Sequence, residues 1–333
     1  MKTHERFVAA ATGRPLDRLP VIEWASWWEQ TLDRWRSEQP AARDLTTGVD
    51  WQRHFGLDVQ LQSWFPTMTA ATPQPATHGA PIVSGLDEYR NIRPTLFPEL
   101  RLDEDYLKLA RQLYADGAGV AWYTLEGFFW FPRQLLGIEN HLYSFYDEPE
   151  LYHTICRDLL AWQKKVVAYC RAQFPFTFMT FAEDLSYNNG PMISREIFAE
   201  FLAPYYREIV PLIRQTGTLT VVDSNGDIAQ ATGWFGACGL DGMLPLERQA
   251  GVEVSLYLDH QPGMFFLGHF DKMVMHQGRA ALEREFARLL PSARRGRFIP
   301  SVDHQTPPAV SYDDYRLYVS LLKQFAVDAA ERP

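Results

Sequence analysis

Short β-prone runs alternate with helical stretches along most of this chain, and the runs end in acidic residues. Residues 178–184 show the unit clearly: an apolar run ends in Glu183 and Asp184, a polar loop follows, and a helical pattern opens at Ser194. Strands that alternate with helices in this way predict a parallel β-sheet covered by helices. This alternation constrains the fold more than any other feature of the sequence.

Seven such runs are visible, and their acidic ends are Glu23, Glu126, Asp184, Asp223, Glu247, Asp271 and Asp303 with His304. Seven strands plus one that the pattern does not place favour an α/β fold of the (β/α)8 TIM-barrel type. The alternative is a doubly wound sheet, which usually carries a glycine-rich phosphate turn after its first strand. Tryptophans and no glycine follow Glu23 within twelve residues, so that turn is missing.

We expect one barrel domain over residues 1–333. Residues 50–100 contain short β-like pieces, such as 57–64, joined by Pro- and Thr-rich links with little helical period. We interpret this region as an insertion or lid after the first strand.

The amino-acid composition limits which classes of protein the chain can belong to. The chain has 46% hydrophobic and 22% charged residues, which suits a large folded core. Its net charge of −9 argues against nucleic acid as a partner. No apolar run reaches the roughly 18 residues of a membrane span, and no apolar segment opens the sequence. The three cysteines are far apart and form no C-x-x-C motif. We therefore expect a cytoplasmic protein without membrane association.

Acids at the ends of barrel strands would converge on one mouth, where barrel enzymes carry their catalytic groups. Each acid alone is as often a helix cap as a functional group. Together they are costly unless a metal ion, bound protons, a cationic substrate or nearby Lys and Arg neutralise them. The mouth is therefore the predicted site.

Two histidines belong to this pattern. His304, next to Asp303, is either a hydrogen-bonded loop residue or a metal ligand or proton carrier. His269 lies two residues before Asp271 and so points to the same side of its strand, either in the mouth or one layer down. The aromatic residues near Trp24 and at 128–131 are packing groups or the wall of a pocket for a flat ligand.

The order of these motifs resembles the uroporphyrinogen decarboxylase superfamily, which includes corrinoid methyltransferases. The resemblance runs nearly end to end and rests on the segments 5–8 with 18–21, 181–206, 223–227, 239–247, 268–271 and 302–308. It implies a (β/α)8 barrel with the site at the carboxyl-terminal mouth. It also places Asp184 at the position of the family's central acid, and family precedent suggests a monomer or homodimer.

Two departures from the family pattern stand out. Uroporphyrinogen decarboxylases carry an arginine-rich stretch after the first strand that holds the porphyrinogen carboxylates, whereas residues 22–28 here are acidic and aromatic. A porphyrin substrate is therefore doubtful. The superfamily's zinc methyltransferases use His and Cys ligands where this chain has residues 223–225 and 303–304, so a zinc thiolate is not supported.

We expect an enzyme that transfers a methyl group from a small substrate, with a corrinoid or folate as carrier and a corrinoid protein as a possible partner. The expected catalytic residues are Asp184, Glu126 and Glu23. The expected substrate-binding residues are Trp24, Tyr187, Asn225, Asp271 and His269. The expected ligands of a divalent metal, Zn, Mn or Fe, are Asp223, Glu247 and His304. Metal-free decarboxylation, and a non-catalytic protein that binds a corrinoid partner, remain as alternatives.

Overall fold

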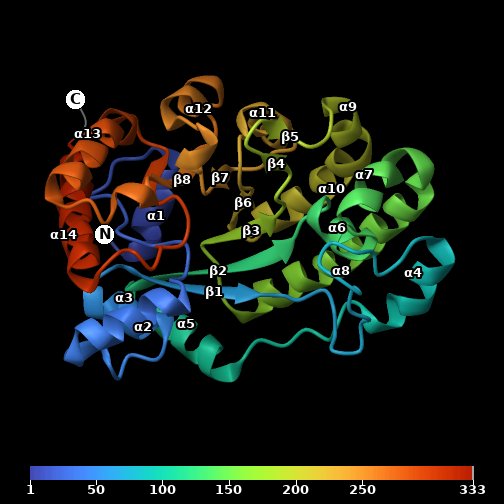
Figure 1. Cartoon of the computed structure of the whole chain (residues 1–333), viewed down its shortest axis with the longest axis horizontal. Coiled ribbons are helices and arrows are strands. Elements are labelled where there is room, and N and C mark those ends of the chain that lie inside the picture. The colour runs from blue at the N-terminus through green and yellow to red at the C-terminus, as the bar shows by residue number, and fades with distance from the viewer. Residues whose placement is uncertain (332–333) are drawn as a thin grey trace.

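The computed structural model describes residues 1–331. Seven parallel strands form one curled sheet in the order β1, β2, β3, β6, β7, β8 and β9 (Figure 1). Their bounds are β1 Val59–Trp64, β2 Gly119–Glu126, β3 Phe178–Ala182, β6 Leu219–Asp223, β7 Gly242–Leu244, β8 Phe265–Phe270 and β9 Phe298–Val302. Two short antiparallel strands, β4 (Ser186–Tyr187) and β5 (Gly190–Pro191), follow β3.

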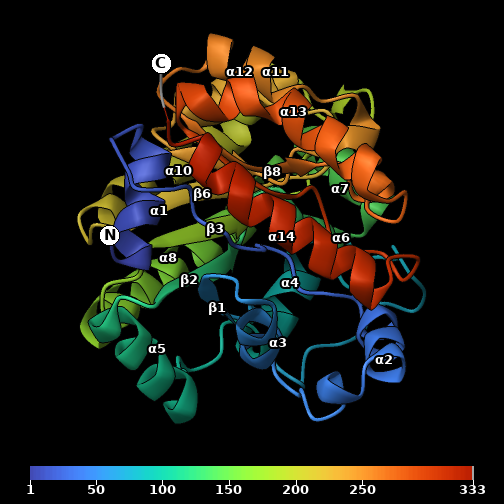
Figure 2. The same ribbon diagram turned by 90° about the vertical axis from the view of Figure 1, so that its left-hand side faces the viewer.

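Helices connect the strands, and in Figure 1 the chain passes round the sheet in sequence order, from blue at the lower left to red at the left. Figure 2 shows α14 crossing the face that also carries α13. The helices are α1 Thr3–Thr12, α2 Glu29–Glu38, α3 Gly48–Phe55, α4 Leu86–Ile92, α5 Glu104–Asp116, α6 Trp130–Leu136, α7 Ile138–Asp147, α8 Pro149–Gln173, α9 Arg195–Ile197, α10 Ala203–Arg214, α11 Ala229–Gly236, α12 Val254–His260, α13 Arg279–Arg295 and α14 Tyr312–Asp328. Within residues 1–331, none has the length and apolar character that a membrane crossing needs.

The first expected strand, residues 19–24, forms no strand, although it lies between the two edges of the sheet. The Asp58 N–H before β1 donates to Val21 O at 2.8 Å, and the Trp24 N–H donates to Ser301 Oγ of β9 at 3.3 Å. Pro20 has no N–H to donate, and Asp58 also binds the Val21 N–H through its carboxylate at 2.9 Å. Side-chain bonds thus replace a backbone ladder, and the sheet has seven strands where eight were predicted.

Residues 57–64 were assigned to an insertion, and this assignment is wrong, because Val59–Trp64 is the edge strand β1 of the main sheet. Two glutamines break the apolar pattern expected of a buried strand. Gln60 Oε1 accepts from Trp122 Nε1 at 2.5 Å, and Gln62 Nε2 donates to Thr124 Oγ1 at 2.9 Å. Residues 65–100 form the long connection from β1 towards α5, in which Met68 and Leu96 pair as an isolated antiparallel bridge.

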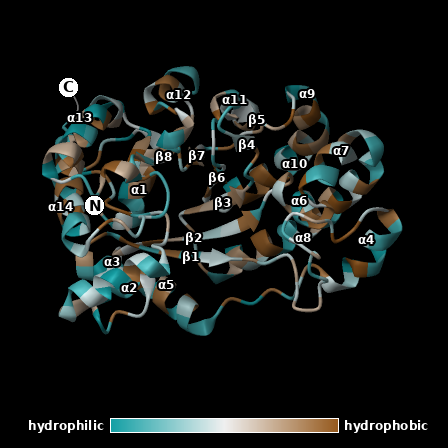
Figure 3. Ribbon diagram, in the orientation of Figure 1, coloured by the Kyte–Doolittle hydropathy of each residue, from teal (hydrophilic) through white to brown (hydrophobic). Residues whose placement is uncertain are grey.

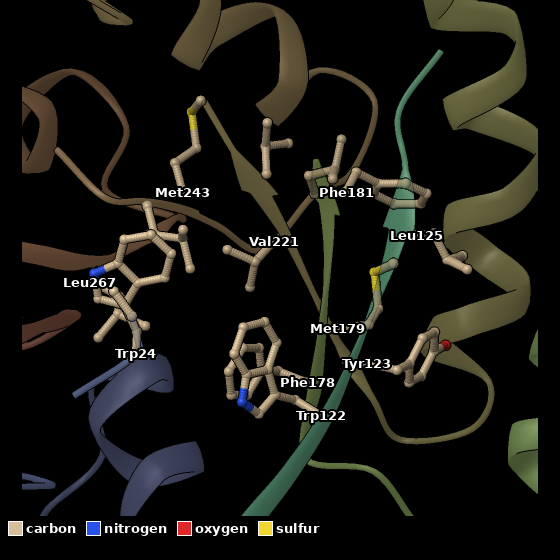
Figure 4. Close-up of a cluster of buried hydrophobic side chains, with 14 of the residues drawn as sticks. Trp24, Trp122, Tyr123, Leu125, Phe178, Met179, Phe181, Val221, Met243 and Leu267 are labelled. Atoms are coloured by element: carbon tan, nitrogen blue, oxygen red, sulfur yellow. The ribbon is translucent and has the colours of Figure 1, made fainter. Parts of the chain in front are cut away.

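Aromatic side chains fill the amino-terminal end of the curled sheet. Phe7 of α1 stacks on Phe178 with ring centroids 4.7 Å apart and meets Phe265 edge to face at 6.1 Å. Phe178 also stacks on Trp122 at 4.8 Å, as the close-up in Figure 4 shows. In Figure 3 brown, hydrophobic residues lie on β3, β1 and β2 are mostly pale, and teal residues gather on outer helices such as α2 and α4. The opposite, carboxyl-terminal end is left for polar groups.

Candidate active site

The strand register brings three positions to one level at the carboxyl end of the sheet. Glu126 ends β2 and pairs with Ala182 of β3, which pairs with Asp223 of β6. Residues paired in a parallel sheet point to the same face, so Glu126 and Asp223 share the inner face of the curl. Adjacent strands lie about 4.8 Å apart, which separates the two acids by about 10 Å along the sheet.

Asp223 is the acid whose surroundings are most unusual. Its side chain is half-buried at the carboxyl end of β6. Among the described residues, none makes a hydrogen bond to its carboxyl group. Burial, together with the negative charge of Asp184, raises the pKa of Asp223 well above its usual range. Both effects favour the protonated form of Asp223.

Asp184 and Asn225 lie beside Asp223 and hold each other. Asp184 Oδ1 accepts from the backbone N–H of Asn225 at 3.0 Å and from its Nδ2 at 2.9 Å. Asp184 has a left-handed backbone with φ of 41°, an uncommon conformation for a residue other than Gly. The amide Oδ1 of Asn225 is buried without a hydrogen-bond partner, so it is free to accept one from a ligand. The structure thus groups three of the predicted residues.

Glu183, the neighbour of Asp184, points the other way. Its carboxylate accepts from Tyr206 Oη, from the Phe129 N–H at 2.8 Å and from the Trp130 N–H at 3.0 Å. Burial raises the pKa of Glu183 to about 7, and these hydrogen bonds offset part of the rise. Glu183 thereby anchors the start of α6 to β3, a structural role that its position next to Asp184 concealed.

On the other side of the mouth, one lysine serves two acids. Lys272 Nζ lies 3.2 Å from Glu247 Oε1 and 3.7 Å from Asp303 Oδ1. Asp303 is buried and accepts from the N–H groups of Arg248 at 2.9 Å and Lys272 at 3.2 Å. Burial raises the pKa of Asp303 to about 6, against the lowering effect of the Lys272 charge. The sequence interpretation overlooked Lys272, although it directly follows the acidic strand end at Asp271.

His304 is half-buried, and its ring meets the Trp24 indole edge to face with centroids 6.2 Å apart. Burial lowers the pKa of His304, while the charges of Glu247 and Asp184 act to raise it. These two acids lie on opposite sides of the mouth, so His304 lies near the space between them. A neutral imidazole here is able to accept or relay a proton.

The predicted metal set is not assembled. Within residues 1–331, no three His, Cys, Asp or Glu side chains form a group able to hold a metal ion. Glu247 is paired with Lys272, and burial favours the protonated form of Asp223, which works against binding of a divalent ion. The three cysteines are all buried away from the mouth, so a thiolate ligand is also missing. No step of the chemistry below therefore uses a metal.

Glu23 and Trp24, predicted as a catalytic and a substrate-binding residue, are both buried and hydrogen-bonded within the protein. Glu23 is 2% exposed and accepts from Tyr318 Oη at 2.7 Å and Ser301 Oγ at 3.2 Å. Burial raises its pKa to about 7. Trp24 is almost buried, and its Nε1–H donates to Val302 O at 2.9 Å. Both residues tie the segment before α2 to β9.

His269, predicted to lie either in the mouth or one layer down, is fully buried. Positive φ angles at Gly268 (117°) and His269 (71°) break the strand alternation on which the prediction rested. The ring is fully buried, accepts from the Val254 N–H at 3.2 Å and bonds Leu246 O at 3.0 Å. Asp271 caps the short 3-10 turn that begins at Lys272, and its carboxylate accepts from Gln249 at 2.8 Å. Tyr187 is 50% exposed on β4, at the rim of this end.

Glu126 opens a second part of the site. Its carboxyl group reaches a cavity of about 360 Å³ between the connection after β1 and helices α6 and α7. We call this the α6 pocket; its lining includes Thr67, Met68, Ile82, Glu126, Trp130 and Arg133. Burial raises the pKa of Glu126 to about 7. Sequence reasoning missed this pocket, because the connection that walls it has no periodic pattern.

Comparison with known proteins places the chain in a family. The family model of uroporphyrinogen decarboxylase (URO-D) matches residues 130–325. Among solved structures, a methyltransferase from Methanosarcina mazei superposes with a TM-score of 0.66 at 14% identity, covering 98% of this chain and 99% of that one. A putative vitamin-B12 independent methionine synthase from Listeria monocytogenes gives a TM-score of 0.49 at 12% identity, covering 94% and 98%. No curated protein sequence matches the chain.

The likeness to the Methanosarcina protein concerns the fold alone, because the sequences share so few residues. The family match extends from α6 to α14 and includes the mouth residues Asp184, Asp223, Glu247 and His304. It covers more than half of the 333 residues, so the chain belongs to the uroporphyrinogen decarboxylase family.

Proposed function

We propose that this protein is a methyltransferase that takes a methyl group from a small methylated substrate, with Asp223 as general acid. The observation that carries this proposal is the Asp223 carboxyl group: it lies at the carboxyl end of β6, has no hydrogen-bond partner among the described residues, and has a pKa raised well above its usual range. A buried acid held neutral by its surroundings is the form in which enzymes keep a proton donor. In this proposal the sheet surrounds the site as a barrel does, and residues 19–24 occupy the position of the eighth strand.

The reaction needs a proton because of its leaving group. A nucleophilic acceptor forms a bond to the methyl carbon while the bond from that carbon to the substrate heteroatom breaks. The bonding electron pair goes to the heteroatom, which takes the proton from Asp223. General acids of this kind contribute roughly 10²- to 10⁴-fold to a rate.

The neighbours of Asp223 fit this role. The fixed charge of Asp184 disfavours ionised Asp223, so it restores the protonated form after each turnover. Asn225 holds Asp184 in place and offers the substrate its unpaired Oδ1. Neutral His304 is placed to return a proton from solvent.

The methyl acceptor in this proposal is a corrinoid or folate carrier, which supplies the nucleophile. The resemblance in fold to a protein named as a methyltransferase supports methyl transfer. The acidic and aromatic segment at 22–28 argues against a porphyrin substrate. The expected divalent metal has no place in the proposal, because its ligands are not grouped.

Decarboxylation is the second candidate, favoured by the family to which the chain belongs. The same protonated Asp223 would then deliver a proton to the substrate carbon as carbon dioxide leaves. The two reactions use one acid and differ in their products, so product analysis separates them.

The test uses chemically reduced cobalamin as methyl acceptor and a panel of methoxy, methylamine and methylthio compounds, with methylcobalamin formation followed by absorbance. We expect transfer by the wild-type protein and a roughly 10²-fold or greater loss of kcat in Asp223→Asn. Asp87→Asn, which changes a fully exposed acid on α4, serves as the control and should keep full activity. Full activity of Asp223→Asn, or carbon dioxide release without methyl transfer, would overturn the proposal.

A further inference from the structure

The α6 pocket contains an arginine whose charge has no partner. Arg133 is half-buried, and its guanidinium lies over the Trp130 ring, 5.0 Å from the ring centroid. Among residues 1–331, no acid forms an ion pair with it and no group accepts a hydrogen bond from its side chain. Arginine supplies a planar fork of donors that matches a carboxylate. An unpaired, stacked arginine in a pocket is thus a receptor for an anion.

A chain of contacts holds this receptor in place. Gln134 donates to Glu126 Oε2 at 2.8 Å and accepts from Trp130 Nε1 at 2.7 Å. The indole is therefore fixed in its plane, and the Arg133 guanidinium rests on that plane. Glu126 makes no ion pair with any described residue, so it does not compete for the arginine.

The opposite wall of the pocket is also held rigidly. The Ile82 N–H donates to Leu135 O at 2.8 Å, and the Ile138 N–H donates to Gly79 O at 3.0 Å. At Gly137, with φ of 74°, an added Cβ would lie 2.6 Å from Gly79 O, so only glycine allows this approach. These contacts fix the position of the pocket wall against α6 and α7.

The rest of the lining is mainly apolar. Met68, Pro75, Ile82 and Ile138 contribute to it, and its volume of about 360 Å³ falls within the range of roughly 300–1,000 Å³ that small-ligand sites occupy. Glu126 lies between the pocket and the mouth. It lines the pocket and shares the inner face of the sheet with Asp223, about 10 Å away. A ligand that binds in the pocket and reacts at Asp223 has to span this distance of about 10 Å.

We propose that the α6 pocket binds the substrate of the proposed methyl transfer, and that this substrate is a monocarboxylate with an apolar body whose carboxylate pairs with Arg133. The single planar guanidinium and the apolar walls favour one carboxylate over a phosphate, since the lining has no second Arg or Lys and its other basic residue is His78. The assignment rests on the proposed function for its second half, the placement of the methyl group at Asp223. Its first half, carboxylate binding at Arg133, stands on the pocket alone.

The test measures binding by calorimetry with 4-methoxybenzoate as probe and 4-methoxybenzamide as its neutral isostere. We expect the acid to bind wild-type protein more tightly than the amide, and Arg133→Met to lose about tenfold to a hundredfold in affinity for the acid alone. Arg133→Lys should fall between the two, because it keeps the charge and loses the fork. Arg195→Met is the matched control, since this exposed arginine also forms no ion pair within residues 1–331 and lies on α9.

The outcomes separate the two proposals. Binding of the acid that depends on Arg133, without methyl transfer to cobalamin, would leave this site standing and remove the proposed reaction. Equal affinity for acid and amide, no binding of the acid, or unchanged binding in an Arg133→Met protein with the wild-type melting temperature would overturn the site.

Discussion

Replacement of Glu126 by Gln tests whether the acid between the pocket and the mouth is neutral. Burial raises the pKa of Glu126 to about 7, from an ordinary value of 4.5 in the unfolded chain. Because the folded state binds the proton more tightly, this group's contribution to stability is fully present below pH 4.5. It is lost as the pH rises towards 7.

The size of this effect follows from the shift. Each pKa unit corresponds to about 1.4 kcal/mol, so raising the pH from 5 to 8 costs the wild-type protein about 2 to 3 kcal/mol through Glu126. Glutamine has the same shape and never ionises, so Glu126→Gln removes this cost. Relative to wild type, the variant should therefore gain about 2 to 3 kcal/mol of unfolding free energy between pH 5 and pH 8.

Urea unfolding at both pH values, followed by tryptophan fluorescence, measures the difference. Glu23, Glu183 and Asp223 also have raised pKa values, but their contributions are common to both proteins and cancel in the comparison. Glu139→Gln, an exposed change on α7, controls for the loss of one negative charge. A stability difference between Glu126→Gln and wild type that is the same at pH 5 and pH 8 would refute the reasoning.

Two further predictions concern the ends of the sheet. Phe7→Ala should destabilise the protein by roughly 3–5 kcal/mol in urea unfolding, because it empties the space between Phe178 and Phe265; a loss below about 1 kcal/mol would mean that α1 does not close this end. Lys272→Met should raise the pKa of Asp303 above about 6, because the lysine charge lowers it. The loss of stability between pH 5 and pH 8 should then exceed that of wild type by about 1.4 kcal/mol per pKa unit, and an unchanged loss would contradict the pairing.

The sequence predicted the middle and later strands of the sheet because each is a short apolar run with an acid at its end. It failed at β1, where Gln60 and Gln62 face inward. Their side chains form hydrogen bonds with Trp122 and Thr124 of the neighbouring strand β2. A polar residue on the inner face looks like a loop residue until its partner is known. The opposite error occurred at residues 19–24. Their sequence predicts a strand, but hydrogen bonds to side chains replace the backbone ladder there.

The site was predicted in part for a similar reason. Asp184, Asp223 and Asn225 are close together because parallel strands end on one edge, which the sequence order already implies. Which of two adjacent acids faces inward depends on one backbone angle, the positive φ of Asp184, and no sequence pattern reports it. Lys272 and the α6 pocket depend on contacts between segments far apart in the chain, so residue types alone could not reveal them.

Bound protons and one lysine offset the mutual repulsion of the acids that converge on the mouth. Glu126 and Asp223 have raised pKa values, and Lys272 serves Glu247 and Asp303. Below about pH 7 the mouth therefore carries much less negative charge than its composition suggests. A carboxylate ligand is acceptable under these conditions, and ionisation of Glu126 at higher pH would repel it.

This argument predicts how binding depends on pH. The affinity of wild-type protein for 4-methoxybenzoate should fall as the pH rises from 6 to 8, because Glu126, with a pKa of about 7, gains a charge over that range. The affinity of Glu126→Gln should change little over the same range, since its side chain stays neutral. A fall of equal size in both proteins would assign the repulsion to another group of the mouth and would separate Glu126 from the binding of the carboxylate.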